Sequence, residues 1–167
     1  IKAIGTVVGK TDALFVVDTI SGLGADIFEN DAWGVDIAIC GSQKGLMIPP
    51  GLAFCSVSQK AWKAAEVSKL PKFYFNFKKY KKAWLNTDTP FTSAITLVIG
   101  LKRALEVINA KGVDNVIAEH TMQANAYRAA VKAMGLSLFS KSPSNAVSGI
   151  NAPQGIDADD IIKLLKT

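Results

Sequence analysis

Two residues whose side chains can do cofactor chemistry each follow an apolar run of this chain. Asp18 ends the run in VVDTISGLGADIF, and Lys44 follows the run in DIAICGSQKGLMIPPG, 26 residues later. A lysine amine condenses with an aldehyde, and a carboxylate keeps a pyridine nitrogen protonated so that the ring accepts electrons. The pair therefore indicates a pyridoxal phosphate site, at a spacing typical of one strand, connection and strand.

Both residues also have a purely structural interpretation. An aspartate at a strand end commonly accepts hydrogen bonds from the turn that follows, and for Asp18 in isolation this role is favoured. A lysine is commonly solvated at the surface. Lys44, however, lies between the apolar strand DIAICG and an apolar loop, where solvation is less easy. Taken together, the two residues favour the cofactor site.

Three segments extend this pattern along essentially the whole chain, namely VVDTISGLGADIF, SQKGLMIPPGLAF and NTDTPFTSAITLVIGLKRALE. In order and spacing they resemble the class V aminotransferases, which depend on pyridoxal phosphate, and within them the serine/alanine–glyoxylate (serine–pyruvate) branch. The lysine in S-Q-K-G followed by P-P-G is the most specific part. The resemblance implies an α/β protein of the PLP-dependent transferase fold type I. The chain would supply the second half of the large domain and part of the small C-terminal α+β domain.

The resemblance also implies roles for four residues on the first two segments. Lys44 would hold the cofactor and move a proton during the reaction, and Asp18 would pair with the pyridine nitrogen. Ile20 would pack under the pyridine ring, since alternate residues of a strand face the same way. Gln43 would hold the cofactor phosphate. A core isoleucine and a surface glutamine are the plain alternatives for the last two.

The third segment carries the loop T-P-F-T-S. In the resembled family a threonine at the position of Thr92 donates its hydroxyl across a homodimer interface to the phosphate in the other subunit. Thr89 begins the loop and is a second candidate for that phosphate, although the glyoxylate branch often has an aromatic residue there. The alternative for Thr92 is a helix N-cap, because threonine is favoured at that position. Both roles are compatible, since a helix N-terminus attracts anions.

The chain has 167 residues, and a class V aminotransferase is expected to be about twice as long. We therefore expect the second half of such a protein. The glycine-rich phosphate loop and the ring-stacking aromatic would lie before it, and the arginine for the substrate carboxylate after it. The element order changes near residue 112, which predicts a large domain over 1–112 and a small domain over 113–167.

The chain carries a net charge of +5, and its pI is near 9.2. Its densest basic segment is KLPKFYFNFKKYKKAW, in which six lysines interleave with six aromatic residues. Such a segment could bind nucleic acid by stacking and charge. Its place before the T-P-F-T loop instead favours a dimer rim or a substrate entrance that attracts anionic amino and keto acids. We expect no nucleic-acid partner.

Composition narrows the class of protein further. Its 49% hydrophobic and 20% charged residues are typical of a folded soluble domain, and no apolar run reaches the ~18 residues of a membrane span. Cys40 and Cys55 lie in apolar strands, which predicts buried free thiols and a cytoplasmic location. The single histidine, His120, falls at a half-buried helix position without further ligands nearby, so we predict no metal site.

Apolar periodicity predicts alternating strands and helices. The expected strands cover 13–18, 36–41 and 52–57 and are buried on both faces; short strands follow at 136–139 and 146–150. Helices are expected over 59–70 with Ser58 as N-cap and Pro71 as stop, over 93–112 and 113–135 with terminal glycines, and over 157–166.

Three hypotheses about function remain. The first is a transaminase that moves an amino group from alanine or serine to glyoxylate or pyruvate. The second is a cysteine desulfurase or related PLP lyase, although those enzymes place a histidine before the lysine where this chain has Gln43. The third is a non-catalytic α/β interaction module, since fold does not imply function.

Overall fold

The computed structural model describes residues 1–166, which divide into two compact units. The first unit comprises residues 1–23 and 28–107, and the second comprises residues 24–27 and those from Ile108 on. Along the chain the elements are α1 (Lys2–Val8), β1 (Val16–Asp18), β2 (Ile37–Gly41), β3 (Ala53–Val57), α2 (Gln59–Val67), α3 (Phe77–Leu85), α4 (Ile95–Lys111), α5 (Val113–Ala133) and α6 (Ala158–Leu165).

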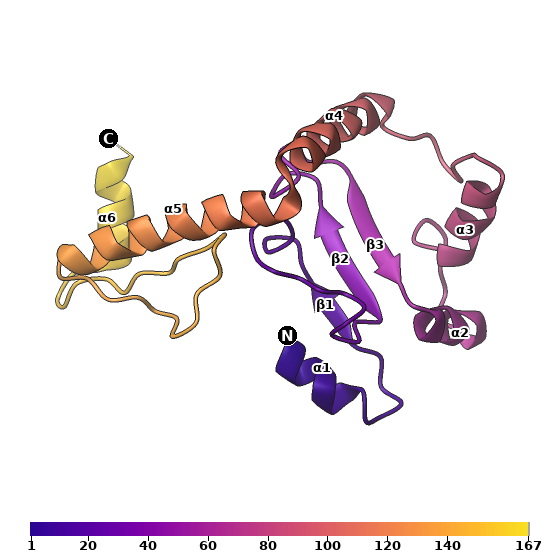
Figure 1. Cartoon of the computed structure of the whole chain (residues 1–167), viewed down its shortest axis with the longest axis horizontal. Coiled ribbons are helices and arrows are strands. Elements are labelled where there is room, and N and C mark those ends of the chain that lie inside the picture. The colour runs from indigo at the N-terminus through magenta and orange to yellow at the C-terminus, as the bar shows by residue number, and fades with distance from the viewer. Residues whose placement is uncertain (167) are drawn as a thin grey trace. The chain divides into compact units, whose positions relative to one another are not determined.

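The first unit contains a three-stranded sheet in the order β1, β2, β3, which Figure 1 shows side by side. β1 runs parallel to β2, and β2 runs antiparallel to β3. In this register Asp18 lies opposite Ile39, and Ile39 lies opposite Cys55. The parallel pair brings the carboxyl ends of β1 and β2 to the same edge of the sheet, as the two apolar runs predict.

The two faces of this sheet differ in burial. On one face Val17, Ala38 and Cys40 are buried, and Val17 and Ala38 join a core with Phe15 and Val35. On the other face Val16 is 50% exposed and Cys55 is exposed. The prediction of strands buried on both faces is therefore wrong for the described residues, and so is the prediction of a buried Cys55. Apolar composition alone does not report whether a second layer covers the sheet.

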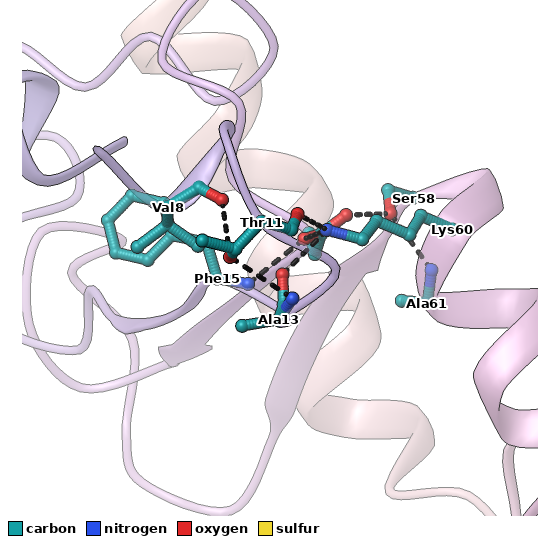
Figure 2. Close-up of polar contacts among 8 residues, drawn as sticks. Val8, Thr11, Ala13, Phe15, Ser58, Lys60 and Ala61 are labelled. Carbon is teal, nitrogen blue, oxygen red and sulfur yellow. Dashed lines mark hydrogen bonds and ion pairs between the residues drawn. The ribbon is translucent and has the colours of Figure 1, made fainter. Parts of the chain in front are cut away.

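A buried carboxylate ties the start of β2 to the elements around it. The Asp36 carboxylate accepts hydrogen bonds from the backbone N–H of Phe15 at 2.9 Å and the Ser58 hydroxyl at 2.6 Å, and the Lys60 Nζ lies 3.7 Å away. Figure 2 shows the Lys60 amine reaching the carbonyls of Thr11 and Ala13 from α2. Burial alone would raise the pKa of Asp36, but these hydrogen bonds and the lysine together lower it.

The helices largely follow the sequence pattern. The Ser58 hydroxyl accepts a hydrogen bond from the N–H of Ala61 at 3.1 Å and Ser58 is the N-cap of α2, as predicted. α2 ends at Val67, before the predicted stop at Pro71. α3 lies in the basic aromatic segment, where no helix was expected from the sequence. Asn76 caps it by accepting hydrogen bonds from two backbone N–H groups. Gly112 separates α4 from α5 at φ +85°, a conformation that favours glycine.

In the second unit, residues 24–27 are held by polar contacts. The Asp26 carboxylate accepts hydrogen bonds from the Ser144 hydroxyl and from the N–H of Asn145 at 3.1 Å. The Asn145 amide donates to the Ala25 carbonyl at 3.2 Å and the Thr121 hydroxyl of α5 at 2.8 Å. The short strands predicted at 136–139 and 146–150 are reduced to one antiparallel bridge, between Leu138 and Ile150.

His120 is half-buried on α5, as predicted. Within residues 1–166, no helix combines the length and the apolar character that crossing a membrane requires.

Candidate active site

Asp18 is the last residue of β1, and its position depends on the threonine that follows. The Thr19 hydroxyl donates to the Ile39 carbonyl at 2.7 Å, and its backbone N–H donates to the same oxygen at 2.8 Å. Thr19 is buried, whereas Asp18 is exposed. The Asp18 Oδ1 accepts from the N–H of Ile20 at 2.9 Å, so the turn contact expected as the structural alternative is present. Oδ2 has no hydrogen-bond partner among the described residues.

Lys44 lies in the loop that follows β2, three residues after its end. The loop is built around Ser42, which is fully buried. The Ser42 hydroxyl donates to the Pro49 carbonyl at 2.8 Å and accepts from the N–H of Leu52 at 3.2 Å, so it joins the two ends of the loop. The Lys44 carbonyl accepts from the N–H of Met47 at 2.9 Å. Met47 has φ +58°, a left-handed conformation that costs on the order of 1 kcal/mol in a non-glycine residue.

The side chains of Ile20 and Gln43 lie over Gly41, the last residue of β2. A Cβ at Gly41 would come 3.0 Å from the Gln43 Oε1 and 3.6 Å from the Ile20 Cγ2. The structure therefore brings together residues from the turn after Asp18 and the loop of Lys44. Ile20 is half-buried and Gln43 is exposed.

The Lys44 loop also packs against the start of α4. A Cβ at Gly51 would come 2.6 Å from the Leu97 Cδ1, and Gly51 has φ +137°. The conformation of Gly51 therefore favours glycine in the P-P-G segment, whereas the Leu97 side chain could shift to relieve the close approach. A Cβ at Gly100 would lie 3.8 Å from the Ile48 Cγ2. These contacts fix the lysine loop relative to the helix that follows Thr92.

Thr89 and Thr92 lie in the segment between α3 and α4. The Thr89 N–H donates to the Asp88 Oδ1 at 2.7 Å, and its hydroxyl donates to the Phe91 carbonyl at 2.9 Å. Thr92 is exposed. α4 begins at Ile95, and its first turn is closed by the Ala94 carbonyl, which accepts from the N–H of Val98 at 3.1 Å. The alternative interpretation of Thr92 as a helix N-cap is therefore wrong, because the helix starts at Ile95 and not at residue 93 as the apolar pattern suggests.

Sequence reasoning did not identify Ser42 or Thr19, the two buried hydroxyls that position the candidate residues. Thr19 directly follows Asp18, and Ser42 lies two residues before Lys44. A serine or threonine at the end of a strand is the signal that could have identified them. Cys40 is buried beside this edge of the sheet. Burial, with a further contribution from the Asp18 carboxylate, raises the pKa of its thiol.

The chemical groups at this edge fit pyridoxal phosphate. The Lys44 amine is exposed and makes no hydrogen bond or ion pair within residues 1–166. The Asp18 Oδ2 is available to a pyridine nitrogen, and the side chains of Ile20 and Gln43 lie together over the buried Gly41. An amine, a carboxylate, an amide and an apolar side chain are the groups that an aldehyde, a pyridinium ring and a phosphate require. Ligands of α/β proteins commonly bind at the carboxyl ends of parallel strands.

The fold and these groups define an α/β protein with a lysine and a carboxylate at the ends of adjacent parallel strands. Residues 1–167 match the family model described as aminotransferase class-V, so the chain belongs to the class V aminotransferases. These enzymes depend on pyridoxal phosphate.

Three curated relatives illustrate the match. The chain is 45% identical over 156 residues to the small subunit of a soluble hydrogenase from Synechococcus sp., covering 92% of this chain and 40% of that protein. It is 42% identical to L-aspartate–glyoxylate aminotransferase of Paracoccus denitrificans, over 92% of this chain and 39% of that protein. It is 43% identical to serine–glyoxylate aminotransferase of Methylorubrum extorquens, over 90% of this chain and 40% of that protein. The chain thus spans about 40% of the length of these relatives.

Solved structures agree with the family. The crystal structure of an alanine–glyoxylate aminotransferase from Nostoc sp. superposes with a TM-score of 0.89 at 26% identity, over 97% of this chain and 44% of that one. The fold class predicted from the sequence, a PLP-dependent transferase fold of type I, is therefore confirmed.

Proposed function

We propose that the protein is a PLP-dependent aminotransferase that moves an amino group from a small amino acid, alanine or serine, to glyoxylate or pyruvate. The observation that carries this proposal is the placement of Asp18 and the Lys44 loop at the carboxyl ends of two adjacent parallel strands. Support for the substrate class comes from relatives named for aspartate, serine or alanine as donor and glyoxylate as acceptor.

Bound pyridoxal phosphate supplies an aldehyde that condenses with amines and a ring that accepts electrons. Lys44 would hold this aldehyde through its Nζ and would move a proton at the substrate carbon. An amine that is free of ion pairs within the described chain is suited to both tasks. Asp18 holds a proton at the pyridine nitrogen through its Oδ2, while its Oδ1 stays in the turn with Ile20.

The remaining candidates orient the cofactor. Ile20 packs against the ring, and Gln43 donates its amide to the phosphate. Thr92, and Thr89 with it, donate hydroxyls to the phosphate of the partner subunit. The Thr89 hydroxyl is already engaged with the Phe91 carbonyl, so Thr92, whose hydroxyl has no partner within residues 1–166, is the stronger donor.

We propose a homodimer as the working unit. The segment around α3 exposes a set of large apolar side chains, and exposed apolar patches usually mark contacts. Its members are Val67, Leu70, Phe73, Phe75, Trp84 and Leu85. A second copy of the chain is the occupant we favour, because the Thr92 loop lies directly after this segment. The two free thiols, Cys40 and Cys55, support a cytoplasmic location.

The alternatives receive less support. A cysteine desulfurase would place a histidine before the lysine, whereas Gln43 precedes Lys44 here and lies over Gly41. A non-catalytic module would not need an amine and a carboxylate at one edge of the sheet.

The test is Lys44→Ala in the full-length protein. We expect loss of the cofactor's visible absorbance and of transamination by several orders of magnitude, since the lysine contributes chemistry and little packing. The thermal unfolding midpoint should stay within about 2 °C, because Lys44 is exposed and unpaired in the described chain. Lys10→Ala, another exposed lysine of the first unit, is the matched control and should change neither property. Retained activity in the Lys44 variant would sink the assignment.

A further inference from the structure

A compact group of rings surrounds the side chain of Phe91, the residue between Pro90 and Thr92. Its centroid lies 4.7 Å from Tyr74 at an interplanar angle of 34°, 5.8 Å from Phe73 and 6.2 Å from Tyr80. We refer to Phe73, Tyr74, Tyr80 and Phe91 as the aromatic cluster. Phe73 and Tyr74 precede α3, whereas Tyr80 lies on it, so the cluster joins α3 to the segment before α4.

A lysine of α3 adds a charged contact to the cluster. The Lys79 Nζ lies 4.5 Å from the centroid of Phe73 and 5.8 Å from that of Phe91. A cation at this distance over an aromatic face is attracted by the ring. Lys79 thus connects the same two rings that lie 5.8 Å apart.

The cluster restrains the loop that carries Thr92. Phe91 is half-buried, whereas Thr92 and Ser93 are exposed. The Phe91 carbonyl also accepts the hydroxyl of Thr89, so both the side chain and the main chain of Phe91 are held. The Thr92 side chain makes no hydrogen bond within residues 1–166. Within residues 1–166, Thr92 therefore has no side-chain anchor of its own and directly follows a residue that is anchored.

We propose that Phe91 is a positioning residue for the cofactor phosphate. The packing of its ring in the aromatic cluster restrains the loop, so that the Thr92 hydroxyl is held where it can bind that phosphate. This inference rests on the proposed function. A hydrogen-bond donor that is already held in place strengthens anion binding more than a mobile one, because ordering a mobile donor on binding costs free energy. Loss of the Phe91 ring leaves the Thr92 hydroxyl present but unrestrained.

Comparison of two ligands in the full-length apoprotein isolates the phosphate. Pyridoxal phosphate and pyridoxal share the aldehyde and ring, and only the first carries a phosphate. We expect Phe91→Ala to weaken pyridoxal phosphate binding by about ten- to hundredfold, the loss of one hydrogen bond to a charged group. Pyridoxal binding should change less than twofold. Binding is measured by titration of absorbance and by equilibrium dialysis, without any assay of activity.

Phe139→Ala is the matched control. Phe139 is a phenylalanine 80% exposed in the second unit and outside the aromatic cluster. Removal of this ring should leave one ratio unchanged, namely the dissociation constant of pyridoxal divided by that of pyridoxal phosphate. Tyr74→Ala removes the ring nearest to Phe91 and should lower that ratio by about two- to tenfold. The Tyr74 variant keeps the inference testable if Phe91→Ala fails to fold, and an unchanged ratio in it would overturn the inference.

A double variant separates positioning from independent effects. If Phe91 acts through Thr92, Phe91→Ala combined with Thr92→Ala should bind pyridoxal phosphate as weakly as Thr92→Ala alone. Additive losses would show that Phe91 acts in another way. Sedimentation of each variant must show the assembly state of the wild type. Dissociation in step with the lost binding would mean that Phe91 acts by holding the subunits together and not by positioning Thr92, and would overturn the inference.

Failure of the proposed function gives a different result. Wild-type protein that binds neither ligand through Lys44 contradicts the aminotransferase assignment and the inference with it. Wild-type protein that binds both, with a Phe91→Ala variant that keeps the wild-type ratio, contradicts the inference alone.

Discussion

At the scale of single residues, Asp18 combines a structural and a chemical position. One carboxylate oxygen closes the turn to the N–H of Ile20 at 2.9 Å, and the other is free of hydrogen bonds within the described chain. The turn role and the proposed cofactor role, which are alternatives in the sequence, would therefore use different oxygens of one side chain.

This division predicts the effect of Asp18→Asn. The asparagine Oδ1 can keep the turn, so the unfolding midpoint should stay near that of the wild type, while the charge that holds a proton at the pyridine nitrogen is lost. We expect the rate constant to fall by about ten- to hundredfold, as for a lost charge-assisted hydrogen bond. Steady-state kinetics and cofactor retention on gel filtration measure this. A near-wild-type rate would mean that Asp18 only closes the turn.

At the scale of elements, buried polar side chains hold the ends of the strands. Ser42 closes the Lys44 loop, Thr19 fastens the end of β1 to β2, and Asp36 fastens the start of β2 to α2. Such groups are costly to leave unpaired in the interior, so each hydrogen bond specifies one arrangement of its loop.

The Asp36 contacts predict acid-sensitive stability. Because the folded-state pKa of Asp36 lies below its ordinary value, the carboxylate stabilises the fold above that ordinary value, near 3.8, and this stability is lost as the pH falls through the folded pKa. Asp36→Asn should therefore lower the free energy of unfolding by about 1–3 kcal/mol at pH 7, with a smaller deficit in acid.

Urea unfolding of the wild type and of Asp36→Asn, at pH 7 and at a pH below 3.8, measures the difference in the free energy of unfolding. Lys60→Gln is the control: its side chain is 43% exposed, so its loss should cost under about 1 kcal/mol. A deficit that is the same at both pH values would contradict a role for the carboxylate charge.

At the scale of the whole molecule, the site we propose needs two subunits. If Thr92 acts across the interface, a dimer of one Lys44→Ala subunit and one Thr92→Ala subunit has both lesions in one site and neither in the other. Heterodimers purified through two different tags should then show about half the wild-type activity at limiting cofactor. If Thr92 acts within its own subunit, each site carries one lesion and this recovery is absent.

Local patterns in the sequence predicted much of this protein. Apolar runs placed Asp18 and the Lys44 loop at strand ends, Ser58 was identified as a cap, and Gly112 as a helix boundary, because these features depend on neighbours within a few residues. The family resemblance rested on the same local segments and is confirmed.

The tertiary structure decided what depends on distant residues. Nothing local predicts that Ser42 meets Pro49 and Leu52, that one face of the sheet is open beside Cys55, or that Phe91 packs on Tyr74. No helix was predicted at α3, although Phe77, Tyr80 and Trp84 recur at the spacing of one helix face. Its cap, Asn76, became visible only with the helix. Spacing along the chain predicted which groups could do chemistry, whereas packing between segments decided how firmly each is held.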